Sequence, residues 1–227
     1  MQEKIYTIPV NEAFEQSDEC PFCTLYKKLE DNEIDLITGA SMMESDVRIK
    51  TNELGFCRKH YDKMLKSGAR LPVALTLQTH LDSLKKDIMP GGLFIKDDAS
   101  KPVKRIKQLD SDCYVCQRIE RHYAKMYETA CLLFENEAEF RGNFLKQSYF
   151  CLPHYARLLE VSKRVNSKKR HAELVKAAGE IVGAYINSLY EDISLFCKKF
   201  DYNSRDLPWG NSKDSPERAI SFLSSDE

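Results

Sequence analysis

The chain has 227 residues, 42% of them hydrophobic, and a formal net charge of -1 at pH 7. This length and composition allow one or two domains with hydrophobic cores, and the small net charge provides no overall field that would attract nucleic acid or anionic membranes. No apolar run approaches the roughly 20 residues of a membrane span, and the N-terminal segment lacks the hydrophobic stretch of a signal peptide. We therefore expect a cytoplasmic protein, in which paired cysteines indicate metal ligands or redox centres rather than disulfides.

The hydrophobic pattern of the first half is mostly helical. Residues 4–10, KIYTIPV, predict an extended lead-in or short strand before a helix capped by Asn11. Residues 71–88 carry apolar side chains at helical spacing, which predicts an amphipathic helix. Residues 90–112 contain two prolines, two glycines and many charges, and so predict a linker.

The second half predicts a long amphipathic helix and a shorter final one. Apolar residues recur every three or four positions between about 168 and 200. Pro216, placed directly after Asp214 and Ser215, is typical of the first turn of a helix. The apolar positions of the long helix are Leu174, Val175, Ala178, Ile181, Val182, Tyr185, Leu189, Ile193, Phe196 and Phe200.

Together these elements predict a mainly α protein with little or no β structure. We expect two duplicated helical zinc-binding units, each closed by a long amphipathic helix. The first unit would span residues 1–89, and the second, with a C-terminal tail, residues 113–227. The alternative is that the two halves pack as one domain.

The most informative motif occurs twice. A Cys-x-x-Cys pair is followed about 35 residues later by Phe-Cys-x-x-His-Tyr. The spacing between the two copies is 93 residues for the first part and 94 for the second, which indicates an internal duplication. The residues are Cys20, Cys23, Cys57 and His60 in the first copy, and Cys113, Cys116, Cys151 and His154 in the second.

Three cysteines and one histidine form a complete tetrahedral ligand set for zinc. A cysteine and a histidine three positions apart lie on one face of a helix, and Pro153 fits such a helix only in its first turn. We therefore predict two zinc ions per chain. Iron is the chemical rival, since iron–sulfur clusters also take cysteine with histidine, but the separation of the two halves of each motif favours zinc.

The sequence leaves two ways of pairing the motif halves. In a sequential arrangement each repeat closes its own site, and in a cross-braced arrangement the Cys-x-x-Cys of one repeat joins the Cys-x-x-His of the other. Duplication favours the sequential arrangement, because a single ancestral repeat had to bind metal by itself or as a dimer.

Several other residues of chemical interest have ordinary structural interpretations. Cys131 and Cys197, outside the repeat, are interpreted as core residues, and His80, His122 and His171 as ordinary helix residues. Trp209 is expected to dock on the main body. The basic residues Lys163, Arg164, Lys168, Lys169 and Arg170, and those at 101–107, are interpreted as solvated surface.

No catalytic constellation is present: the sequence has no glycine-rich phosphate loop and no His-Glu-x-x-His motif. It leaves enzyme activity undecided and favours a structural or interaction scaffold with a protein partner. One alternative is a thiol redox sensor that releases zinc on oxidation. Another is a nucleic-acid-binding module, because residues 101–170 carry 15 Lys or Arg against 8 Asp or Glu.

The chain contains five distinctive segments: KIYTIPVNEAFE, CPFC, GFCRKHY, FCLPHY and WGNSKDSPERAISFL. Together these segments resemble a bacterial family described as a domain of unknown function. The resemblance covers nearly the whole chain, and the Phe-Cys-x-x-His motif is its most specific part. It implies a cytoplasmic bacterial protein and no particular activity.

Overall fold

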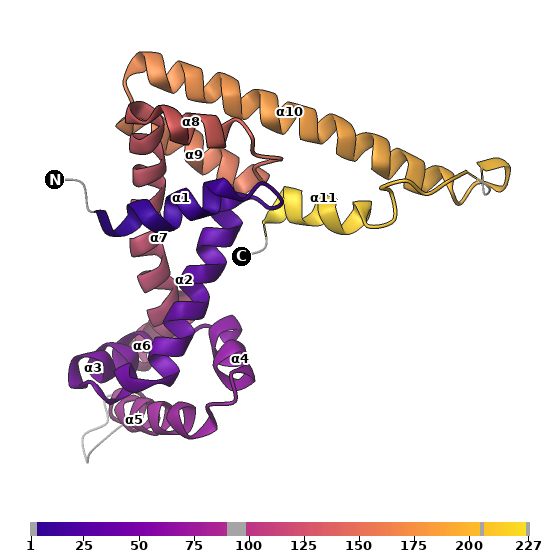
Figure 1. Ribbon diagram of the computed structural model, residues 1–227. Coiled ribbons are helices and arrows are strands. Elements are labelled where there is room, and N and C mark those ends of the chain that lie inside the picture. The colour runs from indigo at the N-terminus through magenta and orange to yellow at the C-terminus, as the bar shows by residue number, and fades with distance from the viewer. Residues whose placement is uncertain (1–3, 90–98, 205–206, 226–227) are drawn as a thin grey trace. The chain divides into compact units, whose positions relative to one another are not determined.

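The computed structural model describes residues 4–89, 99–204 and 207–225 (Figure 1). Within these ranges the protein is 81% helical and contains no strand, so the predicted mainly α fold is confirmed. The α-helices are α1 Thr7–Glu15, α2 Pro21–Thr38, α3 Ser45–Leu54, α4 Arg58–Lys66, α5 Arg70–Ile88, α6 Ser100–Ser111, α7 Tyr114–Asn136, α8 Ala138–Phe144, α9 Leu152–Val165, α10 Lys168–Lys198 and α11 Ser215–Ser224.

The chain forms two compact units. Unit 1 consists of Met1–Lys27 and Tyr123–Glu227, and unit 2 of Lys28–His122. The divisions therefore fall inside α2 and α7, the two helices that begin at the Cys-x-x-Cys motifs. Each of these helices contributes residues to both units.

The core of unit 1 is aromatic. The Phe22 ring, at the start of α2, stacks on Tyr127 of α7 with centroids 4.0 Å apart. Phe14 of α1 lies 5.6 Å from Phe22, and Phe150 lies 6.3 Å from both. All four side chains are at most 1% exposed. Burying rings of this size contributes strongly to stability, so this cluster fixes the start of α2 against the segment before α9.

Unit 2 has a smaller core in which α5 packs against α3, α4 and α6. Two arginines tie its helices together. Arg48 donates to the carbonyl oxygens of Met42 and Leu75, at 2.8 and 3.2 Å. Arg105 of α6 donates to the carbonyls of Asn52 and Glu53 at the end of α3, where helix carbonyls lack partners within the helix. The buried core residues include Ile34, Ile37, Met42, Phe56, Met64, Val73, Val115 and Ile119.

The predicted linker 90–112 is helical over much of its length. Residues 90–98 lie outside the described residues, and Ser100–Ser111 forms α6, which has no buried residue. Its proline, Pro102, stands in the first turn, where a missing backbone N–H leaves no hydrogen bond unmade. A high density of charges therefore indicated an exposed helix rather than an irregular connection.

The predicted extended lead-in at 4–10 is wrong. Lys4–Tyr6 is a 3-10 turn, and α1 begins at Thr7 with Pro9 in its first turn. The branched side chains of this segment suggested a strand, but helical spacing buries Val10, Ala13 and Phe14 on one face of α1. The gain from burying that face outweighs the weak intrinsic preference for extended backbone.

The other helix predictions are confirmed. The apolar segment 71–88 is α5, the long stripe is α10, and Pro216 lies in the first turn of α11. Trp209 contacts the end of α10, with its ring centroid 5.8 Å from that of Phe196. None of the helices that the structure describes is both long and apolar enough to cross a membrane.

Candidate metal centres

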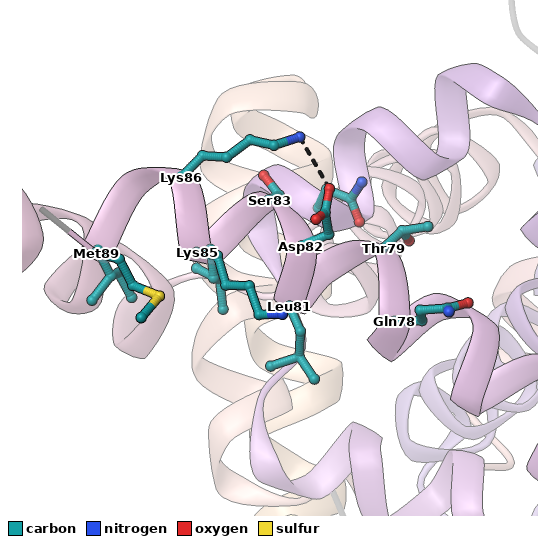
Figure 2. A pocket seen from close by; sticks show the side chains of 11 residues that line it. Gln78, Thr79, Leu81, Asp82, Ser83, Lys85, Lys86 and Met89 are labelled. Atoms are coloured by element: carbon teal, nitrogen blue, oxygen red, sulfur yellow. Dashed lines mark hydrogen bonds and ion pairs between the residues drawn. The ribbon is translucent and has the colours of Figure 1, made fainter. Parts of the chain in front are cut away.

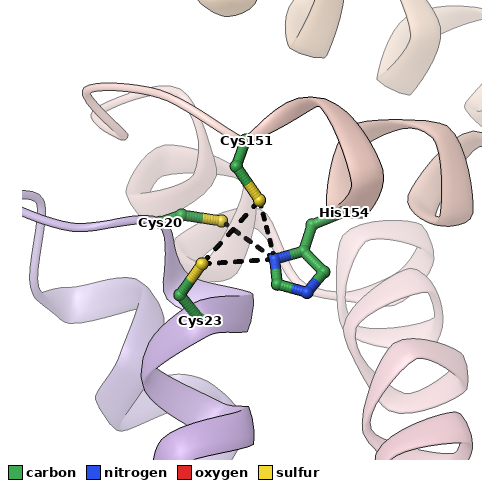
Figure 3. Close-up of side chains that lie close together, drawn as sticks. All are labelled: Cys20, Cys23, Cys151 and His154. Atoms are coloured by element: carbon green, nitrogen blue, oxygen red, sulfur yellow. Dashed lines mark hydrogen bonds between the residues drawn. The ribbon is translucent and has the colours of Figure 1, made fainter. Parts of the chain in front are cut away.

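The eight motif residues meet in two groups, one in each unit. Site 1, in unit 1, consists of Cys20, Cys23, Cys151 and His154 (Figure 3). Site 2, in unit 2, consists of Cys57, His60, Cys113 and Cys116. In each site the four donor atoms lie within 4.8 Å of one another. The motif halves are thus cross-braced, and the expectation that each repeat would close its own site is wrong.

Packing beside the ligands explains this pairing. In unit 1, the Phe22 ring, between Cys20 and Cys23, contacts Phe150 and His154, at 6.3 and 6.1 Å between centroids. In unit 2, the Tyr114 ring beside Cys113 lies 6.1 Å from Phe56, and the Tyr114 amide donates to the Gly55 carbonyl at 2.9 Å. Core contacts of residues adjacent to the ligands therefore bring each Cys-x-x-Cys to the other repeat's histidine.

The helix ends place the second half of each site. Cys57 and Cys151 are the N-caps of α4 and α9, and the histidine follows in the first turn. Cys57 Sγ lies 3.1 Å from His60 Nδ1, and Cys151 Sγ lies 2.9 Å from His154 Nδ1. The requirement that Pro153 occupy the first turn of its helix is met.

The donor spacing fits a single tetrahedral ion. Zn–S bonds of about 2.3 Å place tetrahedral sulfur atoms ~3.8 Å apart, and a sulfur and a nitrogen ~3.5 Å apart. The Sγ–Sγ distance is 3.7 Å between Cys23 and Cys151 and 3.9 Å between Cys57 and Cys116. The distances between Sγ and Nδ1 range from 2.9 to 3.6 Å. Both sites therefore have the dimensions of one ion with four ligands.

In site 2 a buried carboxylate fixes the histidine. His60 Nε2 lies 3.1 Å from Glu30 Oε1, and the two side chains are 0% and 3% exposed. Lys59 Nζ lies 3.0 Å from the same carboxylate, and Lys63 also pairs with it. Because an ionised carboxylate only accepts hydrogen bonds, Nε2 must carry the proton. The lone pair of Nδ1 then points at the three sulfurs, as a metal ligand requires.

In site 1 a tyrosine hydroxyl fixes the histidine. Tyr123 Oη donates to the Phe22 carbonyl at 2.9 Å and lies 2.8 Å from His154 Nε2. Since its hydrogen is directed at Phe22, this hydroxyl accepts from Nε2–H and leaves Nδ1 free to bind a metal. The Arg157 guanidinium lies over the Tyr123 and Tyr127 rings, 5.1 and 4.8 Å from their centroids. This cation–π contact holds the tyrosine in place.

These supporting residues occupy equivalent positions in the two repeats. Glu30 and Tyr123 each stand ten residues after the first cysteine of a Cys-x-x-Cys pair. Lys63 and Arg157 each stand three residues after the histidine. A carboxylate paired with lysine in one repeat is thus replaced by a tyrosine paired with arginine in the other. Sequence reasoning missed all four, although aligning the repeats on their cysteines would have revealed the correspondence.

The charges around site 2 are consistent with a metal ligand set. Burial raises the pKa of Glu30, but hydrogen bonds from Lys63 and Lys59 outweigh burial and hold the pKa below its usual value. Burial lowers the pKa of His60, although Glu30 opposes this change. The imidazole is therefore neutral at pH 7, which is the form that binds metals.

The two sites differ in exposure. In site 1 only Cys23 is partly exposed, whereas in site 2 Cys57 is partly exposed and Cys116 is exposed. Tyr149 stands two residues before Cys151, and its ring stacks on Tyr185 of α10 with centroids 4.4 Å apart. The Tyr149 ring is therefore packed against α10. Burial, together with the nearby Tyr185, Cys20 and Cys23, raises the pKa of the Tyr149 hydroxyl. The equivalent residue of unit 2 is Gly55, which provides no side chain.

Gly55 cannot be replaced by a covering side chain without rearrangement. Its φ is +63°, in the left-handed region that favours glycine. A Cβ at this position would lie 3.1 Å from Leu109 Cδ2 and 3.4 Å from His80 Cε1. The space next to Gly55 is therefore occupied by Leu109 and His80. A hollow of about 570 Å³ next to site 2 is lined by all three cysteines of the site.

The other histidines and cysteines lie outside both sites. His80 Nδ1 lies 3.1 Å from the Asn52 carbonyl, and His171 Nδ1 lies 3.0 Å from Ser162 Oγ, in agreement with ordinary structural roles. Cys131 is fully buried, and burial raises its pKa to about 12, as expected of an inert core thiol. Cys197 is exposed, so its interpretation as a core residue is wrong.

The basic segment at 163–170 joins two helices, since α9 ends at Val165 and α10 begins at Lys168. Lys163, Arg164, Lys168 and Lys169 are exposed there, as the interpretation of a solvated surface requires.

A larger hollow, of about 980 Å³, lies along α5 and is lined by residues that include Asn52, Leu81 and Met89 (Figure 2). Its ion pair joins Lys86 Nζ to Asp82 at 3.0 Å, between exposed side chains one helical turn apart. Such surface pairs contribute little to stability and indicate no site. None of the eight motif residues lines this hollow.

One family model matches the chain over residues 1–227, and its description is "Family of unknown function (DUF6062)". The chain belongs to this family. No curated protein and no solved structure matches it. The family's description names no activity, so the case for a function of this DUF6062 member rests on the two sites.

Proposed function

We propose that this protein is a non-catalytic helical scaffold held together by two structural zinc sites and used to bind a protein partner in the cytoplasm. The observation that carries the proposal is the convergence, in each unit, of three Sγ atoms and one histidine Nδ1 within 4.8 Å. In each case Nε2 is held by a hydrogen-bond acceptor, so the nitrogen facing the sulfurs has a lone pair to give.

The ligand count supports a structural role. Structural zinc sites have four protein ligands, whereas catalytic sites keep a position open for water or substrate. Each site here has four donors, all of a type that zinc prefers. The donors also suit one ion better than an iron–sulfur cluster, in which cysteines bind separate irons and stand farther apart.

Charge balance provides independent support for a divalent ion such as zinc. A zinc ion with three thiolates and one neutral imidazole carries one net negative charge. In site 2, Glu30 adds a second negative charge, and Lys59 and Lys63 supply two positive ones. In site 1, the neutral Tyr123 adds no charge, and Arg157 supplies one positive charge nearby. Each site with its supporting residues would therefore be neutral overall when zinc is bound.

Elemental analysis of the purified, reduced protein tests the proposal. We expect about two zinc ions per chain and no visible absorption, as four-ligand zinc sites predict. Cobalt substitution should give the absorption of tetrahedral cobalt bound to thiolates. A ratio well below one metal per chain would refute the scaffold model, and iron with visible colour would redirect it towards iron–sulfur chemistry.

The residues that hydrogen-bond to the two histidines should each affect the zinc affinity of their own site only. We expect Glu30→Gln to weaken zinc binding at site 2, and Tyr123→Phe at site 1, each by about 10- to 100-fold, because such supporting hydrogen bonds orient the ligand and set its basicity. Competition with a chelator of known affinity would measure each change. Asp82→Asn, at an exposed ion pair on α5, is the matched control and should leave both affinities unchanged. Equal weakening of both sites by either variant would contradict these assignments.

A further inference from the structure

We infer that site 2 is a peroxide-sensitive zinc–thiolate centre, whereas site 1 is a protected structural site. This inference rests on the proposed function, since it requires zinc in both sites. Its basis is the difference in accessibility between ligand sets that are otherwise equivalent.

The exposed ligand of site 2 is Cys116, and its repeat equivalent, Cys23, is only partly exposed. Cys57 is also partly exposed, whereas its equivalent, Cys151, is 0% exposed. The hollow of about 570 Å³ beside site 2 is lined by its three cysteines, of which Cys116 is exposed and Cys57 partly exposed. A small molecule can therefore reach the sulfurs of site 2 more readily than those of site 1.

Three aromatic rings pack together next to the Cys-x-x-His half of site 1 and accompany its greater burial. Tyr149 stacks on Tyr185, and Phe222 of α11 packs on both rings with centroids 5.2 to 6.4 Å away. Tyr185 and Phe222 belong to the C-terminal part of unit 1, after the second repeat's Cys-x-x-His motif, whereas Tyr149 stands two residues before it. Site 2 has Gly55 at the position equivalent to Tyr149.

The charges that line the hollow beside site 2 favour neutral oxidants over anionic ones. Asp110, Asp112 and Glu120 border it, with Arg121 as the one basic residue among those that line it. An acidic border beside the site repels anionic oxidants and anionic thiols. A small neutral hydroperoxide meets no such barrier.

The reaction can be written with its atoms and electrons balanced. A zinc-bound thiol is fully deprotonated, so the Cys116 sulfur attacks one peroxide oxygen, the O–O bond breaks, and hydroxide leaves. The Cys113 thiolate then attacks the resulting sulfenic acid, forms an S–S bond, and displaces a second hydroxide. Two thiolates lose two electrons, the peroxide gains them, and zinc is released because two of its four ligands are gone.

Cys113 is the fitting partner for Cys116. The two residues are three positions apart at the start of α7, and the Cys116 amide donates to Cys113 Sγ at 3.5 Å. A disulfide between such residues is the one that Cys-x-x-Cys motifs of redox proteins form. A thiol reductant and zinc would restore the site.

The test treats zinc-loaded, full-length Cys197→Ser protein with hydrogen peroxide, so that the exposed cysteine outside both sites does not contribute. A chromogenic chelator follows zinc release, and alkylation with peptide mass mapping locates the disulfide. We expect one zinc to leave about tenfold faster than the other, or more, with a Cys113–Cys116 disulfide formed first. Cys20 and Cys23 should still be reduced at that stage.

A second variant tests whether the aromatic rings next to site 1 protect it. Tyr149→Ala should bring zinc release from site 1 closer to the rate of site 2 and leave site 2 unchanged. Simultaneous loss of both ions from the Cys197→Ser protein, or oxidation of Cys20 and Cys23 first, would overturn the inference and leave the scaffold model intact. A chain that holds no zinc before peroxide is added would instead contradict the proposed function.

Discussion

Replacing Cys57 with serine should release the zinc ion of Cys113 and Cys116 and leave the ion of Cys20 and Cys23 bound. The reason is the cross-braced pairing, in which Cys57 Sγ lies 3.9 Å from Cys116 Sγ and in the same unit. Serine is a poor zinc ligand, because its hydroxyl keeps its proton where a thiol loses it. Native mass spectrometry should find one zinc per chain in this variant.

Cys151→Ser is the complementary variant. It should release the ion of Cys20 and Cys23 and leave site 2 loaded. Hydrogen exchange should then show loss of protection mainly in Met1–Lys27 and Tyr123–Glu227, whereas Cys57→Ser affects mainly Lys28–His122. Cys197→Ser, an exposed position in neither site, is the control and should keep both ions. If Cys57→Ser and Cys23→Ser emptied the same site, the pairing would be sequential after all.

Removing both ions with a chelator should unfold much of the chain. Structural zinc contributes about 10 to 16 kcal/mol of apparent binding free energy at neutral pH, which exceeds the stability of most domains. We expect a large loss of helical circular dichroism and of the cooperative thermal transition, both restored by added zinc. Without the ion, the three cysteine sulfurs of each site would also lie close together, and their negative charges as thiolates would repel one another and destabilise the fold.

Magnesium, which prefers oxygen ligands, serves as the control metal and should not restore the fold. Acid should act as the chelator does, because protons compete with the metal for thiolate and imidazole. An unchanged thermal midpoint after complete zinc removal would show that the helical cores suffice and that the ions are not structural.

The fold class and the eight donors could be predicted because they are local properties of the sequence. Helical periodicity identified α5 and α10, and Pro153 placed the start of α9, since each depends only on neighbouring residues. Residues 4–10 were wrongly predicted to be extended, because burial of Phe14 and Val10 in a helix outweighs the preference of neighbouring branched residues for extended backbone. Where local preference and packing disagree, packing decides.

The pairing of the motif halves could not be predicted, because it depends on contacts between distant residues. Both arrangements use the same ligands at the same spacings, and contacts such as the packing of Phe22 on Phe150 and of Tyr114 on Phe56 distinguish them. The supporting residues were missed for a different reason. Glu30 and Tyr123 have different chemistry, so their equivalence is visible only when the repeats are aligned on the cysteines.

The order in which the chain is synthesised gives the cross-braced pairing a consequence for folding. Unit 2 is one continuous stretch, so its ligands are complete once residue 116 has emerged, whereas Cys20 must wait for His154, 134 positions later. Before Cys113 emerges, the nascent chain presents Cys20, Cys23, Cys57 and His60 without the second repeat. That set is itself a full zinc ligand set, so zinc bound there during translation would be a kinetic trap. Emergence of Cys113 and Cys116 must then draw Cys57 and His60 away before the N-terminal pair can reach its native partners.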